Sequence, residues 1–226
     1  EVFYFNEDSI RYRNTGISRM VNIFDARGNR VETRFFNSND SLINFNNQGA
    51  VIRHEYDNRN NEIKRFCLDD MLKPIMNEMQ GFAFVLKYDN MDRLIESTSI
   101  DTCNIPYMMP NLSYSTVKKE YDIYGNILKE SYFNNDSPVD CVQGSHSVNY
   151  VYDKYHQPVE ICYVNSDNRD ASVNGVHRIE RKYLNGKISE EKYYDTNNMC
   201  LGSRQYERDE FGFIDFVQTY YNNSLM

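Results

Sequence analysis

The chain has 226 residues, of which 40% are hydrophobic and 26% charged, and this composition argues against a wholly disordered protein. Its 25 basic and 33 acidic residues give a formal net charge of −8, which argues against binding to nucleic acid phosphates or to an anionic membrane. At roughly 150 residues per domain, the length fits one large domain or an array of small units.

The N-terminus and the cysteines say little about origin. The chain opens at Glu1 without a basic or apolar leader, as expected for a mature form or an excised fragment. The longest apolar run, Gly81 to Leu86, is far shorter than the roughly 20 residues that span a bilayer, so we predict no membrane insertion. No CxxC pair or Cys/His cluster occurs, so we predict neither a structural zinc site nor a dense disulfide framework. The five cysteines are Cys67, Cys103, Cys141, Cys162 and Cys200.

One motif recurs along the chain and predicts its organisation. An aromatic residue and an aspartate are followed, after two variable residues, by glycine or a polar residue, as in Phe24-Asp25-x-x-Gly28-Asn29. Two weaker copies follow the five clear ones, at Tyr183 to Lys187 and at Arg208 to Phe213, so we predict seven units over about residues 16–221. The clear copies have their aspartates 32, 32, 33 and 31 residues apart, at Asp25, Asp57, Asp89, Asp122 and Asp153.

A second recurring position, which we call the second mark, lies eight or nine residues before the turn motif. It is glycine in every copy that has it except the fourth, where serine stands instead. The residues are Gly16, Gly49, Gly81, Ser113, Gly144 and Gly175.

The D-x-x-G spacing predicts a tight turn. Aspartate at the first position of a type I turn accepts a hydrogen bond from the backbone N–H two residues on, and the fourth residue takes a left-handed backbone. Such a turn joins two antiparallel strands in a hairpin with a G1 bulge. The residues at the fourth position all tolerate positive φ and none is β-branched. They are Gly28, Asn60, Asp92, Gly125, His156, Gly186 and Gly212.

The flanks of the turns show strand patterning. Before the turn, apolar or aromatic residues four apart, such as Met20 and Phe24, share one face of a strand. After it, Val31 and Phe36 and their equivalents have an odd separation, which puts them on opposite faces unless a bulge intervenes. We therefore predict an all-β fold of tandem antiparallel β-hairpin repeats that form an extended or curved sheet. The prediction is a single array over residues 1–226 without a separate catalytic domain.

The segments between hairpins are rich in Asn, Asp and Ser, and we expect them to be solvated crossings, as at Asn37 to Asn47 and Asn165 to Asn174. A unit of about 32 residues also has room for a third or fourth short strand. Two stretches, Leu68 to Gln80 and Tyr107 to Ser115, are helix candidates, but prolines weaken both.

Residues with catalytic chemistry are better explained by the turns. His156 is the most conspicuous candidate for a catalytic or metal role, yet it holds the fourth position of its turn and has no second histidine at ligand spacing. His54, His146 and His177 are scattered through the repeat. The turn aspartates, including Asp209, are already used as caps, which argues against general acids. No G-x-S-x-G, P-loop or dinucleotide motif occurs. We predict no enzyme and assign no catalytic, cofactor-binding or metal-binding residue.

Three features of the sequence concern a ligand, and each has two interpretations. The stretch Asn165 to Gly175 has two carboxylates, Asp167 and Asp170, but lacks the pattern of an EF-hand loop, which makes calcium the weaker alternative. A row of charges either pairs between stacked repeats or faces solvent: Glu32, Lys64, Glu96, Lys129, Glu160 and Glu190. Tyrosines either form a surface for sugars or peptides or simply pack the sheet: Tyr132, Tyr163, Tyr193, Tyr194, Tyr220 and Tyr221.

The fourth copy carries a family resemblance. The stretch Tyr121-Asp122-Ile123-Tyr124-Gly125-Asn126-Ile127-Leu128-Lys129-Glu130, followed by Tyr132-Phe133-Asn134, resembles the YD repeats of the RHS-like family in a long-period form. The signature recurs at Phe24 to Phe36. The resemblance implies a bacterial β-repeat protein that is secreted, periplasmic or on the cell surface, and that binds or scaffolds without a cofactor. It transfers no catalytic or ligand-binding residue.

Our functional prediction is a non-enzymatic binding or scaffold module, monomeric, with a protein or glycan partner and no affinity for nucleic acid. One alternative is a carbohydrate-binding module. Another is a shell or spacer segment of a larger RHS-like toxin protein. An enzymatic function is the last of the alternatives, and it would require a deep cleft with two coupled, buried carboxylates.

Overall fold

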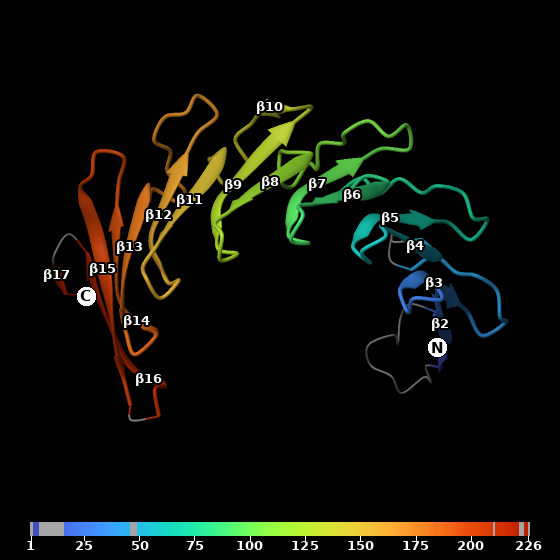
Figure 1. The fold of residues 1–226 in the computed structure, drawn as a ribbon, viewed down its shortest axis with the longest axis horizontal. Helices are drawn as coiled ribbons and strands as arrows, with labels where there is room; N and C mark the ends of the chain where they lie inside the picture. The colour runs from blue at the N-terminus through green and yellow to red at the C-terminus, as the bar shows by residue number, and fades with distance from the viewer. Residues whose placement is uncertain (1, 5–15, 46–48, 210, 222–223, 226) are drawn as a thin grey trace. The chain divides into compact units, whose positions relative to one another are not determined.

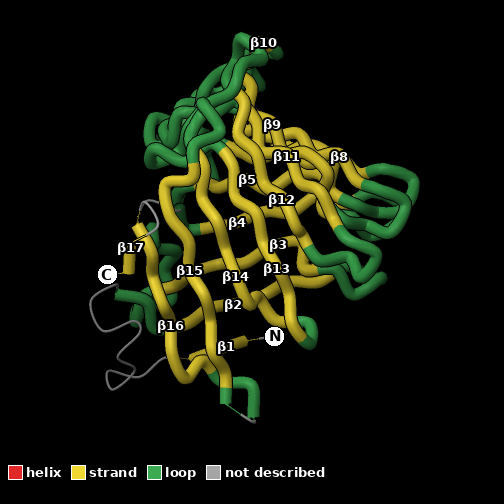
Figure 2. Tube along the Cα trace, turned by 90° about the vertical axis from the view of Figure 1, so that its left-hand side faces the viewer, coloured by secondary structure: helices red, strands yellow, loops and turns green. Residues whose placement is uncertain are grey.

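The computed structural model describes residues 2–4, 16–45, 49–209, 211–221 and 224–225. These ranges contain seventeen β-strands and no helix. Figure 2 shows the strands and the loops that join them. Every register assigned between two strands is antiparallel. No helix among the described residues is long and apolar enough to span a membrane. The predicted all-β hairpin-repeat fold is confirmed, and both helix candidates instead contain turns and isolated β-bridges, such as Leu68–Pro74 and Met109–Tyr114.

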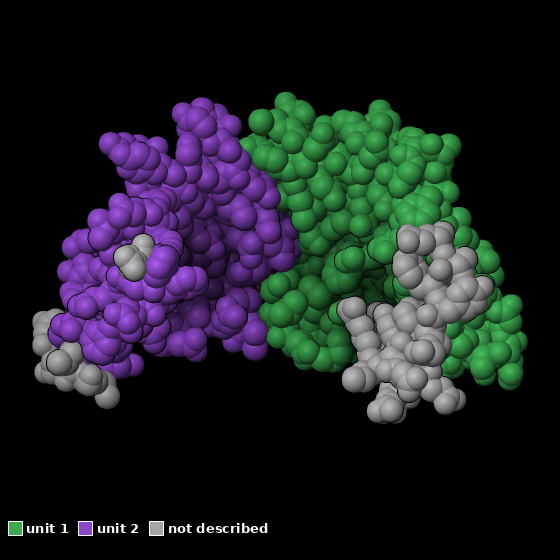
Figure 3. Space-filling view, turned by 90° about the horizontal axis from the view of Figure 1, so that it is seen from below, with its two compact units in different colours: residues 1–116 green, residues 117–226 purple. Residues whose placement is uncertain are grey.

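The chain divides into two compact units, residues 1–116 and 117–226 (Figure 3). Both are built from the same hairpins, and the single array over residues 16–221 stays a prediction. In the first unit the strands are β1 (Val2–Tyr4), β2 (Arg19–Phe24), β3 (Arg30–Phe36), β4 (Val51–Tyr56), β5 (Glu62–Leu68), β6 (Ala83–Tyr88) and β7 (Leu94–Ile100).

Strand β8 (Thr116–Tyr121) begins at the boundary and leads into the second unit. The strands that follow are β9 (Ile127–Asn134), β10 (Ser137–Pro138), β11 (Ser147–Tyr152), β12 (Pro158–Val164), β13 (Arg178–Leu184), β14 (Lys187–Tyr194), β15 (Cys200–Arg208), β16 (Ile214–Tyr221) and β17 (Ser224–Leu225) (Figure 1). In each unit the second strand of one hairpin pairs with the first strand of the next, as β3 does with β4 and β12 with β13.

Each hairpin with an assigned register contains a bulge beside the first residue of the motif, which is aromatic except at Arg208. Ile23 pairs with Glu32, whereas the next residue, Phe24, pairs with Arg30, so Val31 is the extra residue of the second strand. The same shift occurs at Tyr56, Tyr88, Tyr152, Tyr183 and Arg208. The bulge explains the odd spacing of apolar residues after the turn, because it reverses the alternation of faces.

The left-handed backbone predicted for the fourth turn residue is present in all seven turns. The φ angles are 70° at Asn60, 60° at Asp92 and 62° at His156, and the four glycines there are also positive. Ser113 has φ 65°, so the serine adopts the same conformation as the glycines of the second mark. The sixth turn is a two-residue type, because its copy is one residue shorter and Leu184 pairs directly with Lys187.

The crossings are more ordered than the solvated loops that we expected. Each of several crossings opens with a second turn capped by Asn or Asp: the Oδ1 atom of Asn37 accepts from the N–H groups of Asn39 at 2.9 Å and Ser41 at 3.1 Å. Asp69, Asp101, Asn165 and Asp195 repeat this arrangement. Isolated bridges such as Phe36–Leu42 then return the chain along the strand. In the crossing after β9, a short extra strand, β10, pairs with β9.

The apolar core is small. In the first unit Ala50, Val51 and Leu68 form a buried cluster, against which Leu42 and Phe66 pack. Many buried residues elsewhere are polar, so the stability of the fold depends on the hydrogen bonds between strands and turns.

Candidate functional site: the turn ladder and the tyrosine face

The repeated aspartates cap their own turns. The Oδ1 atom of Asp25 accepts hydrogen bonds from the N–H groups of Arg27 and Asn29, both at 2.9 Å, and its carbonyl accepts from Gly28 N–H. Asp57, Asp89, Asp122, Asp153 and Asp209 make the same pair of backbone contacts. The predicted cap is confirmed, and it gives each carboxylate a structural role.

The hydrogen bonds within each turn favour the ionised form of the capping aspartate. At Asp57, desolvation opposes ionisation, but hydrogen bonds from the backbone and amide of Asn61 and from Arg59 N–H outweigh it and lower the pKa. The pKa values of Asp25, Asp89 and Asp122 are lowered by the same kind of contacts. These turns are therefore anchored by carboxylates that stay charged below the usual titration range.

Acid should weaken the fold through these turns. A carboxyl group whose pKa is lower in the folded state stabilises the fold above its unfolded pKa of about 3.9, and this stabilisation is lost as pH falls through the folded pKa. We expect a melting temperature that is constant from about pH 7 to 5 and falls below about pH 4, measured by circular dichroism. Asp57→Asn should flatten the fall, because Asn37 and Asn165 already show that an amide oxygen caps such a turn. An identical fall in that variant would contradict this origin.

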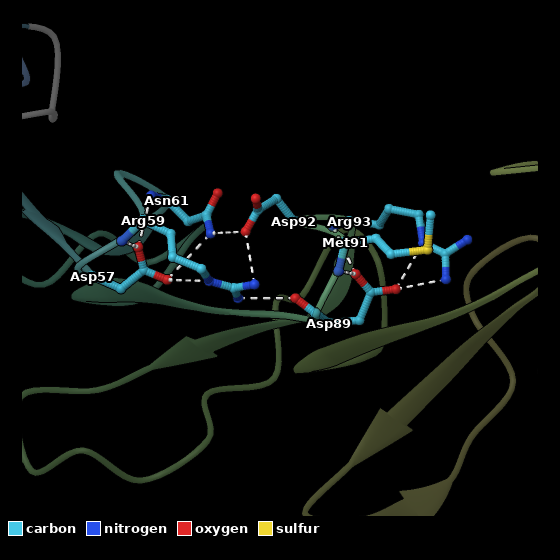
Figure 4. A network of polar contacts seen from close by, with 7 residues as sticks. All are labelled: Asp57, Arg59, Asn61, Asp89, Met91, Asp92 and Arg93. Atoms are coloured by element: carbon cyan, nitrogen blue, oxygen red, sulfur yellow. Dashed lines mark hydrogen bonds and ion pairs between the residues drawn. The ribbon is translucent and has the colours of Figure 1, made fainter.

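Adjacent turns are linked by arginine. Arg27 Nη1 donates to the carbonyl of Asp57, the first residue of the next turn, at 2.9 Å. Arg59 Nη2 repeats this contact with the carbonyl of Asp89 at 2.9 Å, and its Nη1 lies 3.0 Å from Asp92 Oδ1 (Figure 4). The third turn residue thus joins one repeat to the next.

A second link uses the fifth turn residue. Asn29 Nδ2 donates to Asn60 Oδ1 at 2.9 Å, and Asn61 Nδ2 donates to Asp92 Oδ1 at 2.7 Å (Figure 4). In the second unit Asn126 Nδ2 lies 3.0 Å from His156 Nδ1. A polar fourth residue therefore accepts from the asparagine of the preceding turn. Where the fifth residue is Gln157 instead of asparagine, the next fourth residue is Gly186.

The tyrosine of the motif supplies a third link. Tyr56 OH donates to the carbonyl of Arg30 at 3.0 Å. Tyr152 OH and Tyr183 OH donate to the equivalent carbonyls of Ile127 and Pro158 at 2.9 and 3.0 Å. We call these three kinds of contact the turn ladder. Sequence reasoning missed it, although the recurrence of asparagine at the fifth position was an available signal.

The four histidines lie in separate surroundings. His54 is buried with Nδ1 3.1 Å from Glu62 Oε1, whereas His146 and His177 donate from Nδ1 to the carbonyls of Tyr132 and Ala171. His156 takes part in the turn ladder. No group of three or more potential metal ligands occurs among the residues that the structure describes. In the Asn165 segment, Asn165 Oδ1 accepts from two backbone N–H groups of its own turn.

The five cysteines are free thiols. Burial, with the neighbouring carboxylate of Glu160, raises the pKa of Cys162 to about 11. Burial also raises the pKa of Cys67. A thiol with a raised pKa is a poor nucleophile at neutral pH.

The acidic residues of the charge row form ion pairs with bases outside the row. Glu32 contacts Arg34 and Arg53, with 2.7 Å to Arg53 Nε. Its equivalent Lys64 lies two strands away, because β4 stands between β3 and β5. The acids of the row therefore pair with bases of their own or flanking strands, as Glu96 does with Lys87 at 2.6 Å and Glu160 with Arg178 at 3.3 Å.

Two of the six candidate tyrosines share a face, which we call the tyrosine face. Tyr193 and Tyr221 both lie opposite Gly202 and line a pocket of about 150 Å³ with Arg204 and Asn174. Tyr220 lies opposite Ser203, so its side chain points to the other face, where its OH donates to Gln218 Oε1 at 2.7 Å. Tyr132 instead donates to Glu130 Oε1 at 3.0 Å and Tyr194 to Glu180 Oε2 at 2.7 Å. Burial and the hydrogen bond to Glu180 raise the pKa of Tyr194 to about 12. Tyr163 is half-buried.

A buried carboxylate supports this tyrosine face. Glu191 accepts hydrogen bonds from Arg181 Nε at 2.9 Å, Tyr193 OH at 3.0 Å and Tyr206 OH at 2.6 Å. Burial opposes its ionisation, but the bonds from Tyr206, Arg181 and Tyr193 outweigh burial and lower the pKa of Glu191. The charged carboxylate fixes two tyrosine rings and one guanidinium on the same face of β13, β14 and β15.

No known protein family and no curated protein matches this chain. Solved structures similar to it include crystal structures of TcdB2-TccC3-TEV, at 12% identity and a TM-score of 0.43, and of TcdB2-TccC3-Cdc42, at 11% and 0.42. The first match covers 91% of this chain and the second 85%, and the chain spans about a tenth (10%) of the length of either. The β-hairpin repeat fold implied by the YD resemblance is present, while membership of the RHS-like family stays a prediction.

Proposed function

We propose that this chain is a non-enzymatic binding or scaffold module of an extracytoplasmic bacterial protein. The observation that carries the proposal is the use of the motif residues. Each repeated aspartate accepts two backbone N–H bonds in its own turn, and the arginines, asparagines and tyrosines of the motif join adjacent turns. These side chains form their hydrogen bonds with one another and with the backbone, which stiffens the repeats. A stiff repeat array can present its faces to a partner protein.

A carbohydrate-binding module is the second candidate function. It is favoured by the pocket of about 150 Å³ that Tyr193 and Tyr221 line with Arg204 and Asn174. Tyrosine rings provide flat apolar area for a sugar face, and the guanidinium and amide provide hydrogen-bond donors for hydroxyl groups. A shell or spacer segment of a larger protein is a third candidate, and it requires no ligand.

A glycan array with mass-spectrometric readout separates these candidates. For the scaffold proposal we expect neither saturable binding of a glycan class nor release of cleaved products. Saturable binding that is lost in Tyr221→Ala and kept in Tyr124→Ala, an exposed tyrosine outside that pocket, would replace it by the carbohydrate-binding module. Turnover of any arrayed glycan would contradict a non-enzymatic role. Protease accessibility on intact cells of the source bacterium tests the extracytoplasmic location separately.

A further inference from the structure

The first unit contains a pocket of about 270 Å³ over strands β5 and β6. One side is formed by strand residues and the other by the crossing that leads from β5 to β6. Its lining includes Ile52, Arg65, Cys67, Ile75, Asn77 and Phe84.

The pocket occupies the place where the first repeat holds an aromatic pair. In that repeat Phe35 is buried and its ring centroid lies 5.1 Å from that of Phe45. Phe35 O accepts from Ile43 N–H, and Phe45 N–H donates to Gly49 O. In the second repeat the same two backbone contacts are made by Cys67 with Ile75 and by Asn77 with Gly81.

Backbone equivalence therefore assigns Cys67 to the place of Phe35 and Asn77 to the place of Phe45. Strand register agrees, because Met20 lies opposite Phe35 as Ile52 lies opposite Cys67. Two phenyl rings are replaced by a thiol and a short amide, and both of these residues line the pocket. A space of the kind that aromatic rings fill elsewhere in the array is thus available to another molecule.

The lining has an apolar part and a polar part. Ile52, Ile75 and Phe84 provide the surface for a ring. An apolar cavity of about 150 Å³ is enough to admit benzene, so this pocket has room for one ring with a short substituent. Burial raises the pKa of Cys67 and keeps its thiol neutral against such a ring.

Arg65 gives the polar part a positive charge. Its side chain is 50% exposed, and its guanidinium carbon lies 5.8 Å from the centre of the Phe84 ring. Arg65 Nε forms a long ion pair with Glu62 Oε1 at 3.8 Å, beyond hydrogen-bond distance, and Glu62 is not among the lining residues. The lining residues include no carboxylate, while Asn77 and Gln80 add amides. The charge of the lining complements an anionic group.

We propose that this pocket binds a ligand in which a single aromatic ring carries a carboxylate on a short link. The ring takes the place of the missing phenylalanine pair, and the carboxylate faces Arg65. The inference does not rest on the scaffold function, because the array can act as a scaffold with this pocket empty.

Titration of the intact chain with phenylacetate, followed by protein-observed NMR, tests the proposal. For a ligand of this size we expect saturable shifts of residues around the pocket with a Kd of about 1 mM. Cyclohexylacetate keeps the charge without the aromatic ring, and 2-phenylethanol keeps the ring without the charge; both should bind at least several-fold more weakly. The tripeptide Gly-Gly-Phe, which ends in a ring and a carboxylate, distinguishes a chain end from a free aromatic acid. Absence of saturation with phenylacetate and with the peptide up to about 20 mM would overturn the proposal.

Two variants locate the site. Cys67→Phe restores the aromatic residue of the first repeat, and we expect loss of binding with a melting temperature that is unchanged or higher. Arg65→Gln changes a half-exposed side chain, and we expect weaker phenylacetate binding with unchanged binding of 2-phenylethanol. Binding of phenylacetate to a folded Cys67→Phe chain at the wild-type Kd would exclude this pocket. An unchanged Kd in Arg65→Gln would exclude the role of the guanidinium even if Cys67→Phe did not fold.

Discussion

Replacement of Gly49 by alanine is expected to destabilise the first unit by about 3 kcal/mol or more. Gly49 has φ +81°, a conformation that L residues rarely adopt, and a Cβ atom there would lie 2.4 Å from the carbonyl oxygen of Leu68. Neither the positive φ nor the close approach to Leu68 can be relieved by a side-chain movement. The carbonyl of Leu68 is held in place because it accepts from Ala50 N–H at 2.8 Å. Ala50 and Leu68 belong to the buried cluster of this unit, so a displaced strand would also disturb its packing.

Gly28→Ala is the matched control for this prediction. Gly28 lies in the same unit with φ +86°, but a Cβ atom there meets nothing within 4 Å. We expect a loss of about 1–2 kcal/mol from the backbone conformation alone. Urea unfolding of both variants, followed by circular dichroism, measures the difference. Equal losses would show that the close approach to Leu68 has no energetic consequence and that positive φ accounts for the whole effect.

Local rules made the turns predictable from sequence. The choice of residues that tolerate positive φ at Asn60, Asp92 and His156 depends on the backbone of a single turn, and each of those turns has the predicted geometry. The bulge is one of two explanations for the odd spacing after the turn, because spacing alone does not distinguish a bulge from a sheet covered on both faces.

Contacts between repeats were not predictable in the same way. The bond between Asn29 and Asn60 joins residues 31 positions apart, and it depends on how two hairpins lie side by side. The charge row shows the same point: pairing along it would require Glu32 and Lys64 to be neighbours, whereas strand β4 lies between their two strands. The turn motif therefore determines the local structure of each hairpin repeat. The identities of its third, fourth and fifth residues determine how that repeat joins the next one.

The tyrosine face shows a limit set by strand geometry. Tyr193 and Tyr194 are adjacent in sequence, so their side chains point to opposite faces, and a tyrosine-rich segment therefore divides between two surfaces. Tyr193 joins Glu191, whereas Tyr194 joins Glu180. The pocket beside Cys67 was missed because it results from side-chain volume that one repeat lacks, which is visible only when equivalent positions are superposed.

Removal of the Glu191 carboxylate is expected to destabilise the second unit by about 3 kcal/mol in Glu191→Ala. The side chain is 10% exposed and accepts from Arg181 Nε, Tyr193 OH and Tyr206 OH. Alanine would leave a largely buried guanidinium and two phenols without their acceptor, and an uncompensated charge costs more than the intact pair contributes. Glu191→Gln should lose less, because its amide oxygen still accepts from one or two of these donors.

Glu180→Ala provides the control, because Glu180 also contacts an arginine, Arg178, and accepts from a tyrosine, Tyr194 OH at 2.7 Å. Its side chain is 43% exposed, so water can replace the carboxylate and we expect a loss below about 1 kcal/mol. Chemical unfolding monitored by tyrosine fluorescence compares the variants. The double variant Arg181→Met/Glu191→Leu should recover most of the loss if the unpaired guanidinium is its cause. Equal small losses in Glu191→Ala and Glu180→Ala would instead mean that solvent reaches Glu191 and that its network contributes no more than a surface ion pair.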